Sequence, residues 1–170
     1  MSARAVVIVG LMGSGKTSVA GRVARALGRR LYDSDEDLQE WYGRSAADHV
    51  DEYGAELLHT RESDQLRRAL AQDPPPVIAA AASVVEDPAN RAALAEAYVV
   101  WLDAPAPVLA ERMRGGVHRP HFGADPEKLL TRQRERRAGW FAEVADLVVD
   151  VGQVGPDQAS AMILSALDRG

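Results

Sequence analysis

Apolar runs alternate with segments of helical spacing along most of this chain. Short apolar or β-branched runs predict buried strands at Ala5–Val9, Arg30–Tyr32, Val77–Ala80, Tyr98–Leu102 and Leu147–Val151. Apolar positions at helical spacing predict helices at Lys16–Leu27, Glu36–Tyr42, Ala46–Val50, Ala55–Leu70, Pro88–Ala95, Ala106–Arg114, Pro126–Trp140 and Pro156–Leu167. Asp87 and Asp125 are predicted to cap two of these helices. This alternation predicts an α/β fold built on a parallel sheet.

The segment between the first strand and the first helix reads Gly10-Leu11-Met12-Gly13-Ser14-Gly15-Lys16-Thr17 and fits the phosphate-loop pattern G-x-x-x-x-G-K-[ST]. Glycines let the backbone wrap a phosphate, and the amides from Gly13 through Ser14, Gly15 and on to Ser18 would bind the anion together with the helix N-terminus. Lys16 is expected to reach the β- and γ-phosphates, and the Thr17 hydroxyl to bind Mg²⁺. The loop predicts a nucleoside triphosphate but does not define the reaction.

A pair of carboxylates follows the second predicted strand, at Asp33 and Asp35. In extended chain, residues i and i+2 point to the same side, so both would project past the carboxyl end of the strand, where open α/β sheets bind ligands. Phosphoryl transfer needs one carboxylate near Mg²⁺ and another to orient the acceptor hydroxyl and take its proton. The alternative interpretation is that Asp33 only caps the next helix.

The segment 115–125 is polar, flanked by glycines and lies between two predicted helices. Such a segment is typical of a lid over a phosphate site, and the alternative is an ordinary surface loop.

Composition narrows the function classes. The 170 residues fit one domain, 1–170, with 46% hydrophobic and 26% charged residues. A net charge of −5 argues against nucleic acid as a partner. The chain has no cysteine, its first strand follows the N-terminus directly, and no apolar run approaches the roughly 20 residues of a membrane span. We therefore expect a cytoplasmic protein without a membrane segment.

These motifs together resemble the shikimate kinase family. The resemblance also includes Gly43-Arg44-Ser45-Ala46-Ala47-Asp48, similar to that family's G-R-S-I-x-[DE] stretch, Arg119-Pro120 in the lid, and Glu143-Val144-Ala145-Asp146 before the last strand. It implies a three-layer α/β/α phosphate-loop fold whose parallel sheet has five strands in the order 2-3-1-4-5. It also implies ATP as cosubstrate, Mg²⁺ as cofactor, a small hydroxylated acceptor and a monomer.

The resemblance assigns roles to individual positions. Asp33 would hold Mg²⁺ through water, and Asp35 would bind the acceptor hydroxyl and act as base. Arg119 would close onto the phosphates from the lid, Arg112 would flank the adenine, and Arg137 would bind a carboxylate of the acceptor.

Two stretches depart from the family pattern on the acceptor side. The family's G-E-x-x-F-R-x-x-E stretch reads Gly54-Ala55-Glu56-Leu57-Leu58-His59-Thr60-Arg61-Glu62, so His59 stands where an arginine would bind the acceptor carboxylate. Arg61 lies about 200° further round the helix and is not expected to replace it. Three glycines after the third strand are replaced by Ala81, Ala82 and Ser83, whose side chains would intrude on the acceptor and make glycine-only torsions costly.

The complete ATP side and the altered acceptor side leave several hypotheses open. The first is a kinase of this family acting on another small hydroxylated metabolite, such as a cyclitol, a sugar or a sugar acid. Arg137 would favour an acceptor with a negative group. The second is a shikimate kinase with a divergent acceptor site, and the third is an inactive nucleotide-binding protein acting through a partner. The fourth is a nucleoside monophosphate kinase.

Overall fold

A parallel sheet forms the centre of the molecule. The computed structural model describes residues 3–114 and 125–170. The strand order is β2-β3-β1-β4-β5 and all pairings are parallel, as the resemblance predicts. The strands are β1 (Val6–Val9), β2 (Leu31–Asp33), β3 (Val77–Ala79), β4 (Tyr98–Asp103) and β5 (Leu147–Asp150). All four residues of β1 are fully buried, which explains its unbroken β-branched sequence.

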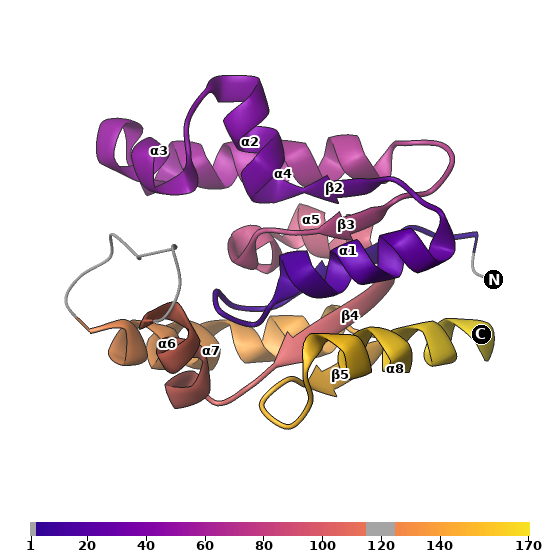
Figure 1. Ribbon diagram of the computed structural model, residues 1–170. Coiled ribbons are helices and arrows are strands. Elements are labelled where there is room, and N and C mark those ends of the chain that lie inside the picture. Colours follow the sequence, from indigo (N-terminus) through magenta and orange to yellow (C-terminus); the bar gives the residue numbers. More distant parts are fainter. Residues whose placement is uncertain (1–2, 115–124) are drawn as a thin grey trace.

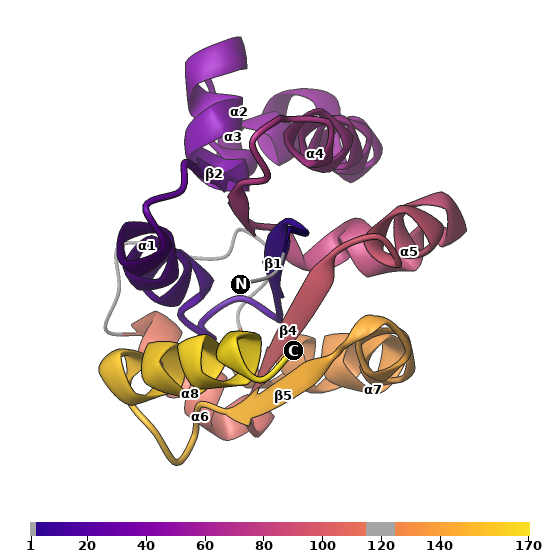
Figure 2. The same cartoon turned by 90° about the vertical axis from the view of Figure 1, so that its right-hand side faces the viewer.

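Helices cover both faces of this sheet. They are α1 (Lys16–Leu27), α2 (Ser34–Tyr42), α3 (Ala46–Tyr53), α4 (Ala55–Leu70), α5 (Pro88–Leu94), α6 (Ala106–Arg114), α7 (Pro126–Val144) and α8 (Pro156–Asp168), with a 3₁₀ turn η1 (Ala82–Glu86) after β3. Figure 2 shows α1 and α8 on one face and α4, α5 and α7 on the other, with α2 and α3 beyond β2. This is the expected three-layer α/β/α arrangement (Figure 1).

Three helices have the bounds that the sequence predicts, and the other predicted elements differ from the observed ones at one or both ends. Helices α1, α4 and α6 have the expected bounds, whereas α7 continues past Trp140 to Val144. Turn η1 was not predicted from the sequence. The Asp87 and Asp125 side chains cap α5 and α7, as predicted.

The core joins the sheet to α7 through an aromatic contact. Trp101 in β4 is 8% exposed and stacks on Phe141 of α7 with ring centroids 5.5 Å apart. Trp41 lies outside this core: it is 36% exposed and lies beneath the Arg68 guanidinium. In the part of the chain that the structure describes, no helix has the length and apolar character to cross a membrane.

Candidate active site at the carboxyl edge of the sheet

The phosphate loop joins β1 to α1 in a backbone shape that requires glycine. Gly13 has φ +83°, and a Cβ there would lie 2.7 Å from the Leu109 carbonyl oxygen on α6. Gly15 caps α1 with φ +86°. The Ser14 hydroxyl donates to the Leu11 carbonyl at 2.7 Å inside the loop, and Ser18 lies on the exposed first turn of α1. The loop therefore combines positive-φ glycines with a helix N-terminus, the arrangement that binds phosphate.

Lys16 carries the positive charge of this loop. Its Nζ donates to the Gly10 carbonyl at 2.8 Å and to the Leu11 carbonyl at 3.1 Å. Burial lowers the pKa of Lys16 to about 8, with a smaller lowering effect from Arg137, while Asp35, Asp33 and Glu62 act to raise it. The pKa of the Lys16 ammonium group is thus affected by nearby carboxylates and by the Arg137 guanidinium.

Thr17 and Asp33 meet beside the loop. The Thr17 hydroxyl donates to Asp33 Oδ2 at 2.5 Å. Asp33 Oδ1 accepts from the backbone N–H groups of Asp35 at 2.9 Å and Glu36 at 3.3 Å, so this buried carboxylate also caps α2. The functional and the capping interpretations are therefore compatible. A hydroxyl and a carboxylate in contact fit the oxygen ligands that Mg²⁺ prefers.

Asp35 lies one residue into α2 and is exposed. The expectation of an extended chain from Asp33 to Asp35 is wrong, because Asp33 caps the helix and α2 already begins at Ser34. The Asp35 carboxylate still acts on the site through its charge. Among the charges near Lys16, it has the largest raising effect on the pKa of that lysine.

A buried acid, Glu62 on α4, lies next to this group. It is 7% exposed, and its Oε1 accepts a 2.9 Å hydrogen bond from the Ser83 hydroxyl. Burial raises the pKa of Glu62 to about 7, and the Asp35 carboxylate adds to this effect. The Ser83 hydrogen bond and the charges of Arg137 and Lys16 oppose it. Residues from α1, α2, α4, η1 and α7 therefore share one electrostatic environment.

Arg137 on α7 is buried in an ion pair with Glu86. Its Nε donates to Glu86 Oε2 at 2.7 Å, and its Nη2 lies 2.6 Å from the same oxygen. Arg136 Nε donates to Glu86 Oε1 at 2.9 Å from the exposed side. Although partial burial acts to raise it, these two guanidinium groups hold the pKa of Glu86 below its usual value. Both oxygens of Glu86 are thus paired with arginine.

His59 on α4 lies near this pair. Desolvation and the Arg137 charge lower the pKa of His59, and the Glu86 carboxylate opposes them. The imidazole is therefore predominantly neutral at neutral pH.

Comparisons with known proteins agree with this geometry. The sequence model of a family described as shikimate kinase matches residues 12–168. A shikimate kinase from Caulobacter vibrioides is 37% identical over 172 residues, covering 98% of this chain and 84% of that protein. A shikimate kinase from Symbiobacterium thermophilum is 36% identical over 168 residues, covering 96% of each. The structure of shikimate kinase from Acinetobacter baumannii in complex with shikimate superposes with a TM-score of 0.90 at 26% identity, covering 98% of this chain and 93% of that chain.

The chain belongs to the shikimate kinase family. It is therefore an ATP-dependent small-molecule kinase with a hydroxyl group as acceptor, and it uses Mg²⁺ with ATP.

The turn after β3 is built without strained torsions. Ala81 is buried with φ −62° and ψ 148°, and Ala82 begins η1. The described residues include no residue other than glycine with positive φ. The expectation of costly glycine-only torsions is therefore wrong, because the chain forms a 3₁₀ turn that alanine and serine adopt readily.

Arg112 and Arg61 make their contacts outside the phosphate loop. Arg112 on α6 donates from Nη2 to the Val151 carbonyl just after β5. Arg61 stacks over Tyr42 at 3.8 Å from the ring centroid and over Tyr53 at 5.7 Å, so it packs α4 against α2 and α3 instead of replacing the arginine absent at His59. Arg119 and the rest of the predicted lid lie outside the described residues.

The sequence patterns did not single out Glu62 and Glu86 as site residues. Glu62 was visible as the last residue of the family stretch that begins at Gly54. Glu86 carried no sequence signal, because only the turn η1 brings it to α7.

Proposed function

We propose that this chain transfers the γ-phosphate of ATP to a hydroxyl group of a small polyhydroxylated metabolite other than shikimate, such as a cyclitol, a sugar or a sugar acid. The observation that carries the proposal is the contrast between a complete set of nucleotide-side groups and an Arg137 that already has a carboxylate partner, Glu86. We also propose that it works as a monomeric, cytoplasmic, single-domain enzyme without nucleic acid, with the segment 115–125 as its lid.

On the nucleotide side, the amides of the phosphate loop from Gly13 to Ser18 would hold the phosphates. Lys16 would neutralise charge on the β- and γ-phosphates, and Arg112 would flank the adenine. Thr17 and Asp33 would hold Mg²⁺, Thr17 directly and Asp33 through water. When bound, the ion neutralises charge on the phosphate oxygens.

On the acceptor side, Asp35 would orient the acceptor hydroxyl and take its proton. The bond that forms joins the acceptor oxygen to the γ-phosphorus, and the bond that breaks joins that phosphorus to the bridging oxygen of the ADP leaving group. Arg119 would stabilise the charge on the transferred group from the lid. The acceptor would contact Asp35, His59, Ala81, Ala82 and the neighbourhood of Arg137.

The test is ADP release from ATP with Mg²⁺, measured by a coupled assay against cyclitols, sugars and sugar acids, with each product identified by mass spectrometry as a phosphate monoester. We expect at least one acceptor to raise ADP release well above the rate without acceptor. Tight ATP binding without turnover on any acceptor would contradict the proposal and favour a nucleotide-binding role.

A second candidate is phosphorylation of shikimate itself. The names of the relatives from Caulobacter vibrioides and Symbiobacterium thermophilum favour it. Against it stand the exchange of arginine for His59 and the pairing of Arg137 with Glu86. Losing one hydrogen bond to a charged group costs about 1.5–3 kcal/mol, so efficient turnover of shikimate would show that these changes are tolerated.

A further inference from the structure

Glu86 is paired with Arg137, the side chain that a negatively charged acceptor would need. Arg137 is 6% exposed, and its Nε and Nη2 both lie within 2.7 Å of Glu86 Oε2. A guanidinium binds a carboxylate through the same pair of N–H groups. The Nε–Nη2 edge of Arg137 is therefore already used by a carboxylate of the chain itself.

This ion pair belongs to the site and not to a remote surface. The Arg137 charge acts on Lys16 of the phosphate loop, on Glu62 beside Asp35 and on His59. Helix α7 is itself anchored to the carboxyl end of β4, because Arg134 donates to both carboxylate oxygens of Asp103 at 3.2 and 2.8 Å. Arg137 lies three residues further along the same helix and so keeps a fixed position relative to the sheet.

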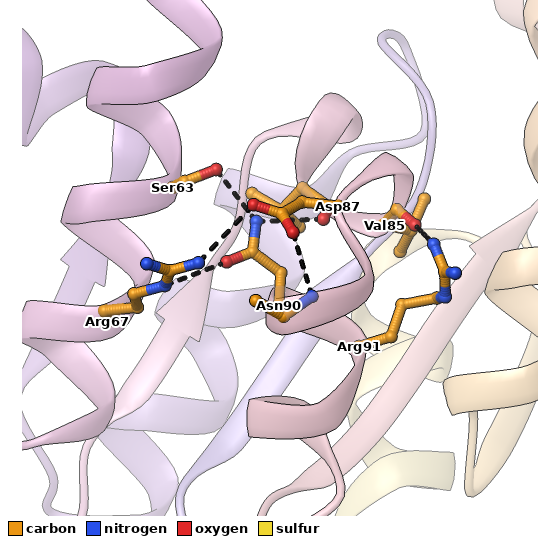
Figure 3. Close-up of polar contacts among 8 residues, drawn as sticks. Ser63, Arg67, Val85, Asp87, Asn90 and Arg91 are labelled. Carbon is orange, nitrogen blue, oxygen red and sulfur yellow. Dashed lines mark hydrogen bonds and ion pairs between the residues drawn. The ribbon is translucent and has the colours of Figure 1, made fainter.

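The turn that carries Glu86 is also fixed, by a network drawn in Figure 3. The buried Asn90 donates to the Val84 carbonyl at 3.0 Å and to the Ser63 hydroxyl at 2.8 Å on α4. Arg91 donates to the Val85 carbonyl at 2.7 Å.

A second part of this network fastens the residue next to Glu86. Arg67 on α4 lies 3.4 Å from Asp87 and donates to Asn90 Oδ1 at 3.3 Å, and Asp87 caps α5 by accepting from Ala89. The network holds both carbonyls that precede Glu86 and the side chain that follows it. Glu86 is therefore presented to Arg137 by a rigid turn.

The charges around the acceptor position then balance without a substrate anion. Arg137 is neutralised by Glu86, His59 is predominantly neutral, and Asp35 and Glu62 are acids. A carboxylate on the acceptor would compete with Glu86 for Arg137. Displacing Glu86 would break a buried ion pair and leave this partly buried carboxylate with Arg136 as its remaining arginine partner, close to other acids, which is costly.

Resting on the proposed function, we propose that Glu86 is a specificity-determining residue that supplies the carboxylate partner of Arg137, so that the acceptor is an uncharged polyhydroxylated compound, a cyclitol or sugar without a carboxylate. This narrows the substrate class by excluding sugar acids. It also gives Arg137 a defined role: it holds Glu86 in place beside the acceptor.

The experiment compares matched acceptors that differ only in charge: shikimate, and the analogue in which a hydroxymethyl group replaces the carboxylate. The value of kcat/KM is measured for both with the wild type and with Glu86→Gln. The wild type is expected to favour the uncharged analogue. Glu86→Gln, which frees Arg137, is expected to raise the shikimate-to-analogue ratio by about ten- to a hundredfold.

The matched control is Glu143→Gln, which removes a carboxylate from the Arg91–Glu143 ion pair (3.0 Å) where the glutamate is 61% exposed. It should leave the ratio unchanged. A second substitution, Glu86→Thr, and thermal melting of each variant separate a change in specificity from loss of folding. Calorimetric titration of both ligands, in the presence of a non-hydrolysable ATP analogue, gives the same ratio without turnover.

Turnover with an unchanged ratio in both Glu86 variants would overturn the inference while leaving the proposed kinase function intact. A wild type that prefers shikimate, or an amine-bearing cyclitol over the neutral one, would overturn it as well. Absence of ADP release with every acceptor of the wider panel would overturn the proposed function and this inference together.

Discussion

The nucleotide side and the acceptor side of this site are built by different means. On the nucleotide side, backbone shape dominates: positive-φ glycines and the N-terminus of α1 form the loop, and the Lys16, Thr17 and Asp33 side chains lie beside it, at the ends of β1 and β2. On the acceptor side, side chains from α4, η1 and α7 determine the charge. The two sides therefore draw on separate elements, so a substitution on one side can leave the other unchanged.

Asp35 links the two sides of the site, because its charge acts on both Lys16 and Glu62. We expect the largest effect from its substitution. Asp35→Asn should lower acceptor-dependent ADP release by about 10²–10⁴-fold, the usual contribution of a general base. ATP binding should survive, because the phosphate loop is untouched. The coupled assay and ATP titration measure both quantities, with Glu36→Gln on the adjacent exposed position as control. Equal activity of Asp35→Asn and Glu36→Gln would remove Asp35 from the chemistry.

Lys16 tests the nucleotide side alone. Lys16→Ala should lower kcat by about 10²–10³-fold, because it removes the ammonium group proposed to neutralise the transferred phosphate. The chain contains one other lysine, Lys128, on the exposed side of α7. Lys128→Ala is the matched control, and near-normal activity of Lys16→Ala in steady-state kinetics would contradict the assignment.

Glu62 tests how strongly the acceptor side is constrained by burial. Its pKa is raised from 4.5 to about 7, so the folded protein binds more protons than the unfolded chain between these values, and stability falls as pH rises through this range. The shift corresponds to about 3 kcal/mol at pH 8. Glu62→Gln should therefore raise the free energy of unfolding at pH 8 and have little effect below pH 4.5.

Urea unfolding at several pH values measures this difference between Glu62→Gln and the wild type. Glu111→Gln, at an exposed α6 position, provides the control. A difference that does not grow between pH 4.5 and 7 would show that Glu62 keeps an ordinary pKa.

The smallest expected effect concerns the support of α2 and α3. Arg61→Ala should lower the free energy of unfolding by about 1 kcal/mol, because it removes the guanidinium that stacks on Tyr42 and Tyr53. Arg132→Ala, at an exposed α7 position, should have almost no effect. If instead Arg61→Ala selectively abolished acceptor use at unchanged thermal stability, Arg61 would belong to the acceptor site after all.

Most of the fold and the shape of the phosphate loop could be predicted from the sequence, because local patterns encode them. The run of β1, the glycine loop and the spacing of α1 identify a phosphate loop without any tertiary information. The acceptor side could be predicted only in part. Its key pair, Glu86 and Arg137, lies 51 residues apart, and η1 is too short to carry a periodic signal. Helix α2 began earlier than expected because Asp33 both caps it and contacts Thr17.

The most direct measurement is kcat/KM for shikimate with the wild-type chain, taken beside its affinity for ATP. We predict tight ATP binding and a rate of ADP release with shikimate close to the rate without any acceptor. A kcat/KM for shikimate of about 10⁴ M⁻¹s⁻¹ or more, within the range of ordinary enzymes, would contradict it. That result would mean that the Arg137–Glu86 ion pair does not exclude an acceptor with a carboxylate.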